Sequence, residues 1–217
     1  MTTRVCVPYR GDGGGWRDRS WQYVRSWWQA AGWQVHTGDT PGPFNRAAAR
    51  NAAAAGSWDV AVFADSDTIL LEGTETVADA VELAHATSGA VLPHRRYIAL
   101  TSRGTQLLLA GKAYEGHTKY EKADTPLGIV VVSRAAWEAT GGFDERWRGW
   151  GGEDVAFRIA CSTLARLDRL DGTLLHLWHP RDATKGQYIA ARGGPLREAY
   201  RKADGDPAAL RKLLEDR

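Results

Sequence analysis

The clearest strand in the sequence runs directly into a pair of acidic residues. Residues 58–64 read WDVAVFA, and Asp65-Ser66-Asp67 follows them without a break. A short run rich in β-branched and aromatic residues is typical of a strand within a sheet. Open α/β sheets bind their ligands at the carboxyl ends of such strands. This stretch therefore favours an α/β fold and predicts a ligand site directly after residue 64.

Asp65 and Asp67 have the spacing needed to share a cation. Two carboxylates one residue apart at a strand end can hold a hard divalent ion, which in turn can hold two phosphate oxygens. The bare Asp-x-Asp pattern is common and is usually a solvated turn. The strand that precedes it is what favours the metal-binding interpretation.

Strand-like and helix-like segments alternate along the rest of the chain. Apolar runs predict further strands at residues 4–8, 33–37, 89–93, 97–101, 127–133 and 173–175. Helical spacing or alanine-rich composition predicts helices at residues 21–31, 46–55, 74–86, 134–140 and 153–161. Residues 103–124 mix a leucine run with polar residues, and we expect a loop insertion there. This alternation, over a length of 217 residues, fits one domain with a full core.

Composition excludes few partners. The formal net charge of +2 is too balanced to indicate nucleic acid or a membrane surface. We expect no membrane anchor and no secretory signal, and hence a cytoplasmic protein in which Cys6 and Cys161 are reduced and buried. Ten tryptophans mildly favour a ligand with sugar or base rings.

Residues 141–158, which read GGFDERWRGWGGEDVAFR, combine glycines, two tryptophans and an acid pair. Glu153 and Asp154 stand at the start of a predicted helix, where the helix dipole favours carboxylates. A lone acid pair in this position would more often only cap the helix. The glycines and rings before it favour a functional connector.

Two further segments carry candidate site residues. The first strand ends at Pro8, and a glycine-rich turn then leads into a helix, which is the form of a nucleotide site. A turn with a solvated arginine is the alternative. Near the other end, His176 and His179 follow a predicted strand, and both can bind one ion only if the chain turns between them. A histidine-bearing edge strand is the alternative there. Nitrogen ligands would favour manganese over magnesium.

Four of these segments resemble metal-dependent GT-A glycosyltransferases, and they occur in that family's order. In the β-1,4-galactosyltransferases and their chondroitin-synthase-like relatives, a Gly-Phe segment leads into Trp-Gly-Gly-Glu-Asp, as Gly142-Phe143 here leads into residues 150–154. Pro8-Tyr9-Arg10 resembles the family's Pro-Phe-Arg, with Tyr9 as a departure. Phe44-Asn45-Arg46 and the Asp-x-Asp pattern complete the set, and the resemblance covers roughly residues 4–180.

The resemblance implies a GT-A fold, which is a Rossmann-like α/β/α sandwich around a mixed, mostly parallel sheet. It implies a nucleotide-binding half at about residues 1–100 and an acceptor and metal half at about residues 101–180. A basic helical tail would follow at 181–217. We interpret the tail as a mostly solvated face, with Arg181 and Lys185 as weak candidates for a lid.

The resemblance also implies roles for individual residues. Asp67 would be the direct metal ligand, with His176 and His179 completing a manganese site, and Asp65 would meet the ribose or a metal-bound water. Residues in contact with the nucleotide sugar would be Pro8, Tyr9, Arg10, Phe44, Arg46, Asp65, Ser66, Gly128, Trp150 and Gly151.

The implied activity is transfer of a sugar from a nucleotide-diphosphate sugar to an acceptor hydroxyl, and the donor that we expect is a UDP-sugar. Retaining relatives carry Asn where this chain has Asp154, so we predict inversion, with Asp154 as general base and Glu153 orienting hydroxyls. The acceptor would be a glycan, a protein or a modified nucleobase, docked near Trp147, Trp150 and residues 112–120. The sequence indicates neither the donor sugar nor the oligomeric state.

Three other functions are alternatives to inverting sugar transfer. A retaining transferase of the same fold would differ only in the role of Asp154. A sugar nucleotidyltransferase would also need a glycine-rich first loop and a metal held by carboxylates, but it has no use for Trp-Gly-Gly-Glu-Asp beside two histidines. A carbohydrate-binding protein would predict an all-β pattern, against the helices expected here.

Overall fold

Two sheets form the centre of the computed structural model, which describes residues 1–125, 128–147, 151–180 and 193–217. The larger sheet has six strands in the described part of the chain, in the order β2-β1-β3-β8-β5-β9. Its strands are β1 (Thr3–Pro8), β2 (Val35–Gly38), β3 (Val60–Ala64), β5 (Ala90–Leu92), β8 (Ile129–Ser133) and β9 (Leu167–Arg169). Only β8 runs antiparallel to its neighbours among these strands. The predicted mixed, mostly parallel sheet is confirmed.

The smaller sheet has four strands in the described residues, in the order β4-β10-β6-β7. They are β4 (Thr68–Leu70), β6 (Arg96–Leu100), β7 (Thr118–Ala123) and β10 (Thr173–His176). β10 pairs antiparallel with β4 and parallel with β6. Because β4 begins four residues after β3 ends, this pairing brings β10 close to the carboxyl end of β3.

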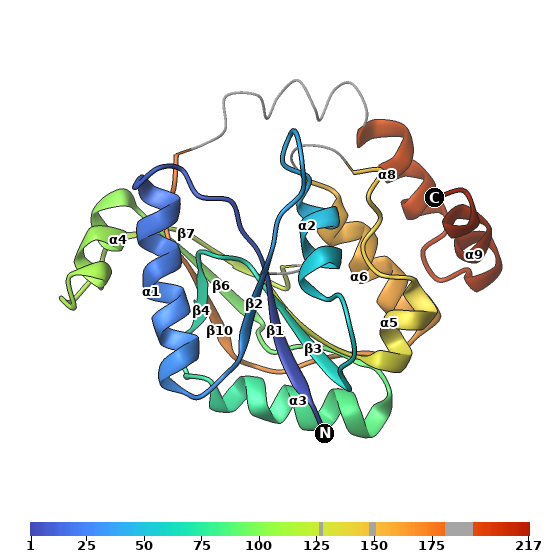
Figure 1. Cartoon of the computed structure of the whole chain (residues 1–217), viewed down its shortest axis with the longest axis horizontal. Coiled ribbons are helices and arrows are strands. Elements are labelled where there is room, and N and C mark those ends of the chain that lie inside the picture. Colours follow the sequence, from blue (N-terminus) through green and yellow to red (C-terminus); the bar gives the residue numbers. More distant parts are fainter. Residues whose placement is uncertain (126–127, 148–150, 181–192) are drawn as a thin grey trace.

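Helices cover both faces of the larger sheet (Figure 1). They are α1 (Trp16–Ala30), α2 (Arg46–Ala53), α3 (Glu75–Thr87), α4 (Ser102–Leu109), α5 (Arg134–Thr140), α6 (Glu153–Leu164), α8 (Gly193–Lys202) and α9 (Pro207–Glu215). Side chains along β3 point alternately to the two faces of the sheet, which explains why helices pack on both. Val60 and Val62 pack in the core cluster of α1 and α3, whereas Ala61 and Phe63 pack in that of α2, α5 and α6.

The two cysteines are buried and unpaired, as predicted. Burial raises the pKa of the Cys6 thiol to about 12, and it raises that of Cys161 to about 12 as well. None of the described helices is both long enough and apolar enough to cross a membrane.

The expected loop insertion at residues 103–124 is wrong, because this stretch forms α4 and β7. Thr101 begins α4 by accepting a hydrogen bond from the backbone N–H of Gly104 at 3.0 Å. β7 is exposed along its whole length and pairs only with β6 among the described strands. A fully exposed polar strand has no apolar alternation for a sequence pattern to detect.

In the described part of the tail, residues 193–217, the charged side chains of Arg197, Arg201 and Lys202 are exposed, whereas its apolar side chains are packed on α6. Trp147, Ile159, Tyr200 and Leu210 are buried together in a cluster that joins α6 to α8 and α9. Asp206 caps α9, and Pro207 occupies the first turn of this helix.

Candidate functional site

The turn after β3 is held by two other strands. The backbone N–H of Asp65 donates to the carbonyl of Gly128, next to β8, at 2.9 Å. The carbonyl of Asp67 accepts a hydrogen bond from the backbone N–H of Leu177, just after β10, at 2.8 Å. The Asp-x-Asp segment therefore lies where three strand ends meet, and its side chains have fixed neighbours.

Asp67, His176 and His179 lie close enough to bind one ion. The Oδ2 atom of Asp67 is 3.7 Å from His176 Nε2 and 3.4 Å from His179 Nε2. One ligand atom from each of the three residues can be chosen so that all lie within 4.8 Å of one another. Burial lowers the pKa of His176, although the charge of Asp67 opposes this shift. A neutral imidazole is the form that binds metals.

The chain does turn between the two histidines, as a shared ion requires. The backbone N–H of Trp178 donates to the buried hydroxyl of Thr105, on α4, at 2.7 Å. The ring of Trp178 packs edge-on against Trp16, at the start of α1, with ring centroids 4.9 Å apart. This docking of Trp178 on two helices fixes the turn and leaves both imidazoles on the side of Asp67.

The donor set suits a divalent transition metal. Ligand atoms about 2.1 Å from an ion are separated by roughly 3–4 Å, and the distances around Asp67 are compatible with that range. One carboxylate and two imidazoles favour manganese or a related ion over magnesium, which prefers oxygen ligands. The three residues therefore fit the metal that the sequence predicted for them.

Beside this group, two arginines of α2 lie among three carboxylates. Arg50 contacts Asp65 Oδ1 and Asp154 Oδ1, each at 2.6 Å. Arg46 Nε lies 3.3 Å from Glu153 Oε1. The guanidinium groups thus connect the end of β3 to the start of α6. The acid pair does more than stand in the first turn of α6, because both acids also contact arginines of α2.

The two acids of the pair differ in their surroundings. The side chain of Glu153 is 2% exposed and that of Asp154 is 24% exposed. Burial raises the pKa of Glu153, and the charge of Asp154 adds to this effect while Arg46 and Arg50 oppose it. Asp154 is therefore the acid of the pair that an incoming molecule can reach.

The start of α6 requires glycine. Gly152 has a φ of 120°, and a Cβ atom there would lie 2.0 Å from the ring of Trp147. Gly151 also has a positive φ, of 80°, but it faces open space. Trp150, the neighbouring candidate for the nucleotide sugar, lies outside the described residues, as do Arg181 and Lys185.

The predicted nucleotide segment lies at the carboxyl ends of β1 and β2. Pro8 ends β1, and the Tyr9 hydroxyl donates to Asp18 Oδ1 at 2.6 Å. Arg10 pairs with Asp39 at 2.7 Å and lies over the ring of Phe44, 5.3 Å from its centroid. Arg10 thus ties the end of β1 to the loop that precedes α2. In this structure Arg10 contacts Asp39 and Phe44 of the protein itself.

Gly128 has a packing reason to be glycine. Its φ is 134°, and a Cβ atom would lie 2.5 Å from a methyl carbon of Leu174. Together with its hydrogen bond from Asp65, this makes Gly128 part of the support of the Asp-x-Asp turn. Its predicted role in contacting the donor sugar stays a prediction, as does that of Ser66, which lies half-buried in the same turn.

Docking of the acceptor near Trp147 stays a prediction, and the Trp147 ring itself is buried. This side chain is 6% exposed and packs against Tyr200, with ring centroids 6.3 Å apart. The tail helices cover this ring. The residues next to Trp147 in the sequence do not indicate that cover.

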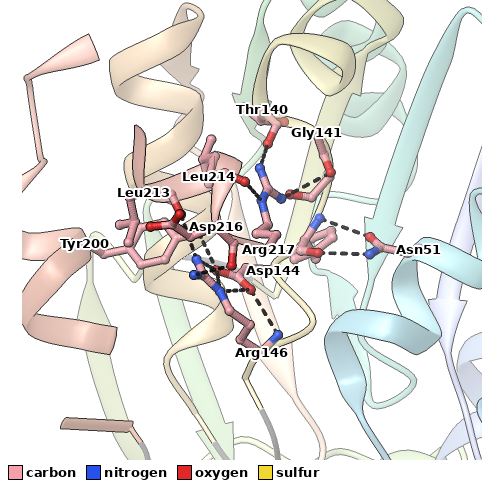
Figure 2. A network of polar contacts seen from close by, with 12 residues as sticks. Asn51, Thr140, Gly141, Asp144, Arg146, Tyr200, Leu213, Leu214, Asp216 and Arg217 are labelled. Atoms are coloured by element: carbon pink, nitrogen blue, oxygen red, sulfur yellow. Dashed lines mark hydrogen bonds and ion pairs between the residues drawn. The ribbon is translucent and has the colours of Figure 1, made fainter. Parts of the chain in front are cut away.

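A polar network holds the segment before α6 from both sides (Figure 2). From the tail, Tyr200 donates to Asp144 Oδ2 at 2.8 Å, and Arg146 joins Asp144 to the carbonyl of Leu213 at 3.0 Å. From α2, the Asn51 side chain donates to the carbonyl of Phe143 at 2.9 Å and accepts from its N–H at 3.0 Å. Residues 143–146, which precede the acid pair in the sequence, are therefore fixed between α2 and the tail.

Sequence reasoning did not select Arg50, Asn51, Thr105 or Asp144. A signal existed for Arg50, which stands four residues after Arg46 and so lies on the same face of a helix. Thr105 has no such signal, because it lies in residues 103–124, for which the sequence predicts a loop.

The family model for the N-terminal domain of galactosyltransferase matches residues 105–172. The match runs from α4 to the end of β9 and includes the acid pair, but it stops short of the histidines and does not reach back to Asp67. No curated protein sequence matches the chain.

Solved structures of glycosyltransferases share the fold. The catalytic domain of Drosophila β1,4-galactosyltransferase 7, solved with xylobiose, is 17% identical with a TM-score of 0.54, over 88% of this chain and 79% of that one. GalNAc-T7 with UDP, GalNAc and Mn²⁺ is 13% identical with a TM-score of 0.52, over 100% of this chain and 54% of that one. A fragment of S. aureus TarS with UDP-GlcNAc is 14% identical with a TM-score of 0.53, over 100% and 71%. The predicted GT-A fold is confirmed.

Proposed function

We propose that this chain, which has the fold of GT-A glycosyltransferases, transfers a sugar from a nucleotide-diphosphate sugar to an acceptor hydroxyl. The observation that carries the proposal is the grouping of Asp67, His176 and His179 next to the acids of α6, at the carboxyl end of β3. That end of an α/β sheet is where ligands bind. A bound metal ion can stabilise the leaving diphosphate, and an accessible carboxylate can accept the proton of the attacking hydroxyl. Together they support a displacement at a sugar carbon.

UDP is the nucleotide we propose. Solved structures with this fold hold UDP or a UDP-sugar: a variant of the Drosophila enzyme holds manganese and UDP-Gal, GalNAc-T7 holds UDP and Mn²⁺, and TarS holds UDP-GlcNAc. Their sugars differ, so we propose no particular donor sugar. In this chain, Arg10 and Phe44 at the ends of β1 and β2 would meet the nucleoside.

Asp67, His176 and His179 would hold the divalent cation, which we propose to be Mn²⁺. When bound, the cation supplies positive charge that stabilises the leaving diphosphate. Arg46 and Asp65 lie between this group and the acid pair, their side chains 3.9 Å apart, and would contact the donor.

Asp154 is the proposed general base. It would accept the proton of the acceptor hydroxyl while the hydroxyl oxygen forms a bond to the anomeric carbon. The bond from that carbon to the diphosphate oxygen breaks, and its electron pair leaves with the diphosphate. Because the acceptor attacks from the face opposite the leaving group, an α-linked donor would give a β-linked product. Glu153 is buried beside Asp154, so its proposed part in orienting a hydroxyl group of the donor or the acceptor would be exerted through Arg46, 3.3 Å away.

The metal assignment is tested by calorimetry of Mn²⁺ and UDP binding. Asp67→Ala should abolish manganese-dependent UDP binding, and replacing both His176 and His179 by Ala should weaken it strongly, because each change removes a ligand. Asp171→Ala is the control, since this exposed acid pairs only with Arg95 in the described structure. Equal affinities in all variants would contradict the metal site.

The reaction is tested with UDP-sugars, Mn²⁺ and fractionated glycan or protein acceptors. We expect UDP release and a β-linked product, identified by proton NMR of the first product formed. Asp154→Asn should retain UDP binding and lose roughly a hundredfold or more in turnover, since an amide cannot accept the proton. An α-linked product would favour the retaining alternative. Release of pyrophosphate from a sugar phosphate and UTP would favour a nucleotidyltransferase.

A further inference from the structure

Arg50 is a buried cation shared by two separate parts of the site. Its side chain is 2% exposed, and its two terminal nitrogens reach different acids. Nη2 lies 2.6 Å from Asp65 Oδ1, and Nη1 lies 2.6 Å from Asp154 Oδ1. One planar group thus links the turn after β3 to the first turn of α6.

The surroundings fix the position of this guanidinium. Its central carbon lies 4.8 Å from the ring centroid of Phe143, which is fully buried. The next residue of α2, Asn51, bonds both the N–H and the carbonyl of Phe143. At the other end of α2, Asn45 caps the helix and donates to the carbonyl of Glu145 at 2.9 Å. Arg50 is therefore held on a helix that is itself bonded to the segment leading into α6.

The contact with Arg50 makes the two oxygens of Asp154 unequal. Oδ1 is engaged at 2.6 Å, whereas Oδ2 lies 3.8 Å from Arg46, beyond hydrogen-bonding distance. An oxygen held in this way fixes the rotation of the carboxylate and directs the other oxygen. Oδ2 is the atom left to accept a proton.

We infer that Arg50 is a positioning residue, which holds Asp154 in the orientation needed to deprotonate the acceptor. It also keeps Asp154 at a fixed position relative to Asp65, on the donor side. The inference rests on the proposed function, because it assigns a role in that reaction. It also explains why a charged side chain is buried at this point of α2, where the remaining members of the buried face are alanines.

Only a guanidinium can make both contacts. Its planar fork presents two nitrogens in fixed directions, whereas an ammonium is a single point of charge. Lys at this position would keep the charge and the fold but would reach one carboxylate at a time. Arg50→Lys therefore separates positioning from charge compensation.

The test measures donor hydrolysis, with water in the place of the acceptor, using a UDP-sugar and Mn²⁺. Arg50→Lys should lower kcat by roughly tenfold to a hundredfold, because small misplacements of a reacting group cost up to about that much. The KM for the donor and the calorimetric affinity for UDP and Mn²⁺ should change by less than about threefold. Arg50→Gln, whose amide can reach one carboxylate but carries no charge, should lower kcat further.

A double-variant comparison shows whether Arg50 acts through Asp154. In an Asp154→Asn background, Arg50→Lys should cause little further loss of kcat, since the group that it positions is already absent. Arg134→Lys is the matched control. Arg134 also lies over an aromatic ring, that of Trp58 at 3.7 Å, and donates to backbone carbonyls away from the acids.

The outcomes are distinct. A normal kcat in Arg50→Lys or Arg50→Gln, with an active wild type, would overturn the inference and leave the proposed function standing. An equal loss from Arg50→Lys with and without Asp154 would also overturn it. If the wild type releases no UDP from any UDP-sugar while binding UDP and Mn²⁺, the proposed function fails and the inference falls with it.

Discussion

Glu153 is a buried acid of the site. Its side chain is 2% exposed, and neither carboxylate oxygen accepts a hydrogen bond from the residues that the structure describes. Its nearest ion-pair partner is Arg46, at 3.3 Å. Burial and the charge of Asp154 raise its pKa above the ordinary value of 4.5. The folded protein therefore favours the protonated form more than the unfolded chain does.

This shift predicts how the stability of a variant depends on pH. A raised pKa in the folded state contributes stability that is complete below the unfolded-state pKa and is lost as the pH rises through the folded-state pKa. Glu153→Gln removes that loss, so its Tm should exceed that of the wild type at pH 7, and the difference should disappear below about pH 4. Thermal unfolding across this pH range measures it.

Glu138→Gln is the control for this prediction, because Glu138 is exposed on α5. Its Tm should follow the wild type at each pH. A Glu153→Gln protein that unfolds at a lower temperature than the wild type at pH 7 would show instead that Glu153 stabilises the fold as an anion paired with Arg46.

At the same scale, the sequence indicated the acids and histidines of the site but not what holds them. Asp67 and His179 stand at strand ends in recognisable patterns, and the structure brings them within 3.4 Å. Arg50 and Asp144 act through contacts with residues far away in the chain, which spacing along the sequence does not show. The burial of Trp147 is not evident from the local sequence for the same reason, since the helices that bury it follow more than 40 residues later.

Elements with an apolar face were predictable, and elements without one were not. β3 and β8 are buried at every position, and their apolar runs identified them. β7 is exposed at every position, and its sequence TKYEKA carries no alternation of polar and apolar residues. β4 and β9 have three residues each, too few for a period to appear. Pairing with neighbouring strands, rather than local propensity, accounts for these three.

Of the elements that were missed, α4 bears most directly on the site. The buried hydroxyl of Thr105 accepts the hydrogen bond from Trp178 N–H, between the two histidines. Thr105→Val keeps the shape of the side chain and leaves this N–H without its partner. The variant should lose about 1–3 kcal/mol of stability and bind Mn²⁺ and UDP more weakly, because the turn that carries the histidines loosens. Chemical unfolding and calorimetry measure the two effects.

Thr140→Val is the matched control. Thr140 is equally buried, but its hydroxyl donates to the carbonyls of Ala136 and Trp137 within α5. We expect this variant to lose stability and to keep its affinity for Mn²⁺ and UDP. Unchanged affinity in Thr105→Val would contradict the role of α4 in supporting the metal site.

At the scale of the whole molecule, the C-terminal end of the chain packs against the middle of the sequence. α8 and α9 pack on α6, and Arg217 donates to the carbonyls of Thr140, Gly141 and Gly142, which end α5 (Figure 2). We propose that residues 1–217 act as one glycosyltransferase domain in which the tail is part of the support of the acid pair. A tail that was merely attached would not contribute buried side chains to the packing of α6.

Tyr200 is the residue with which this coupling is most directly tested. Tyr200→Phe keeps the ring against Trp147 and removes the hydroxyl that donates to Asp144. The free energy of unfolding should fall by about 1–3 kcal/mol at pH 7, the range for a hydrogen bond to a charged group. Hydrogen exchange should show faster exchange of α6 amides, while those of α3, which does not contact the tail cluster, should be unchanged.

The pH dependence of this loss identifies Asp144 as the partner. Burial alone would raise the pKa of Asp144, but hydrogen bonds from Arg146 and Tyr200 lower it overall. A lowered pKa contributes stability that is present above the unfolded-state value of 3.8 and is lost as the pH falls through the folded-state value. The difference in free energy of unfolding between Tyr200→Phe and the wild type should therefore be largest near neutral pH and shrink in acid.

The control is Tyr23→Phe, on the partly buried side of α1, which should show no such pH-dependent difference. A penalty in Tyr200→Phe that stays constant down to pH 2 would mean that the ring environment, and not the bond to Asp144, joins the tail to α6.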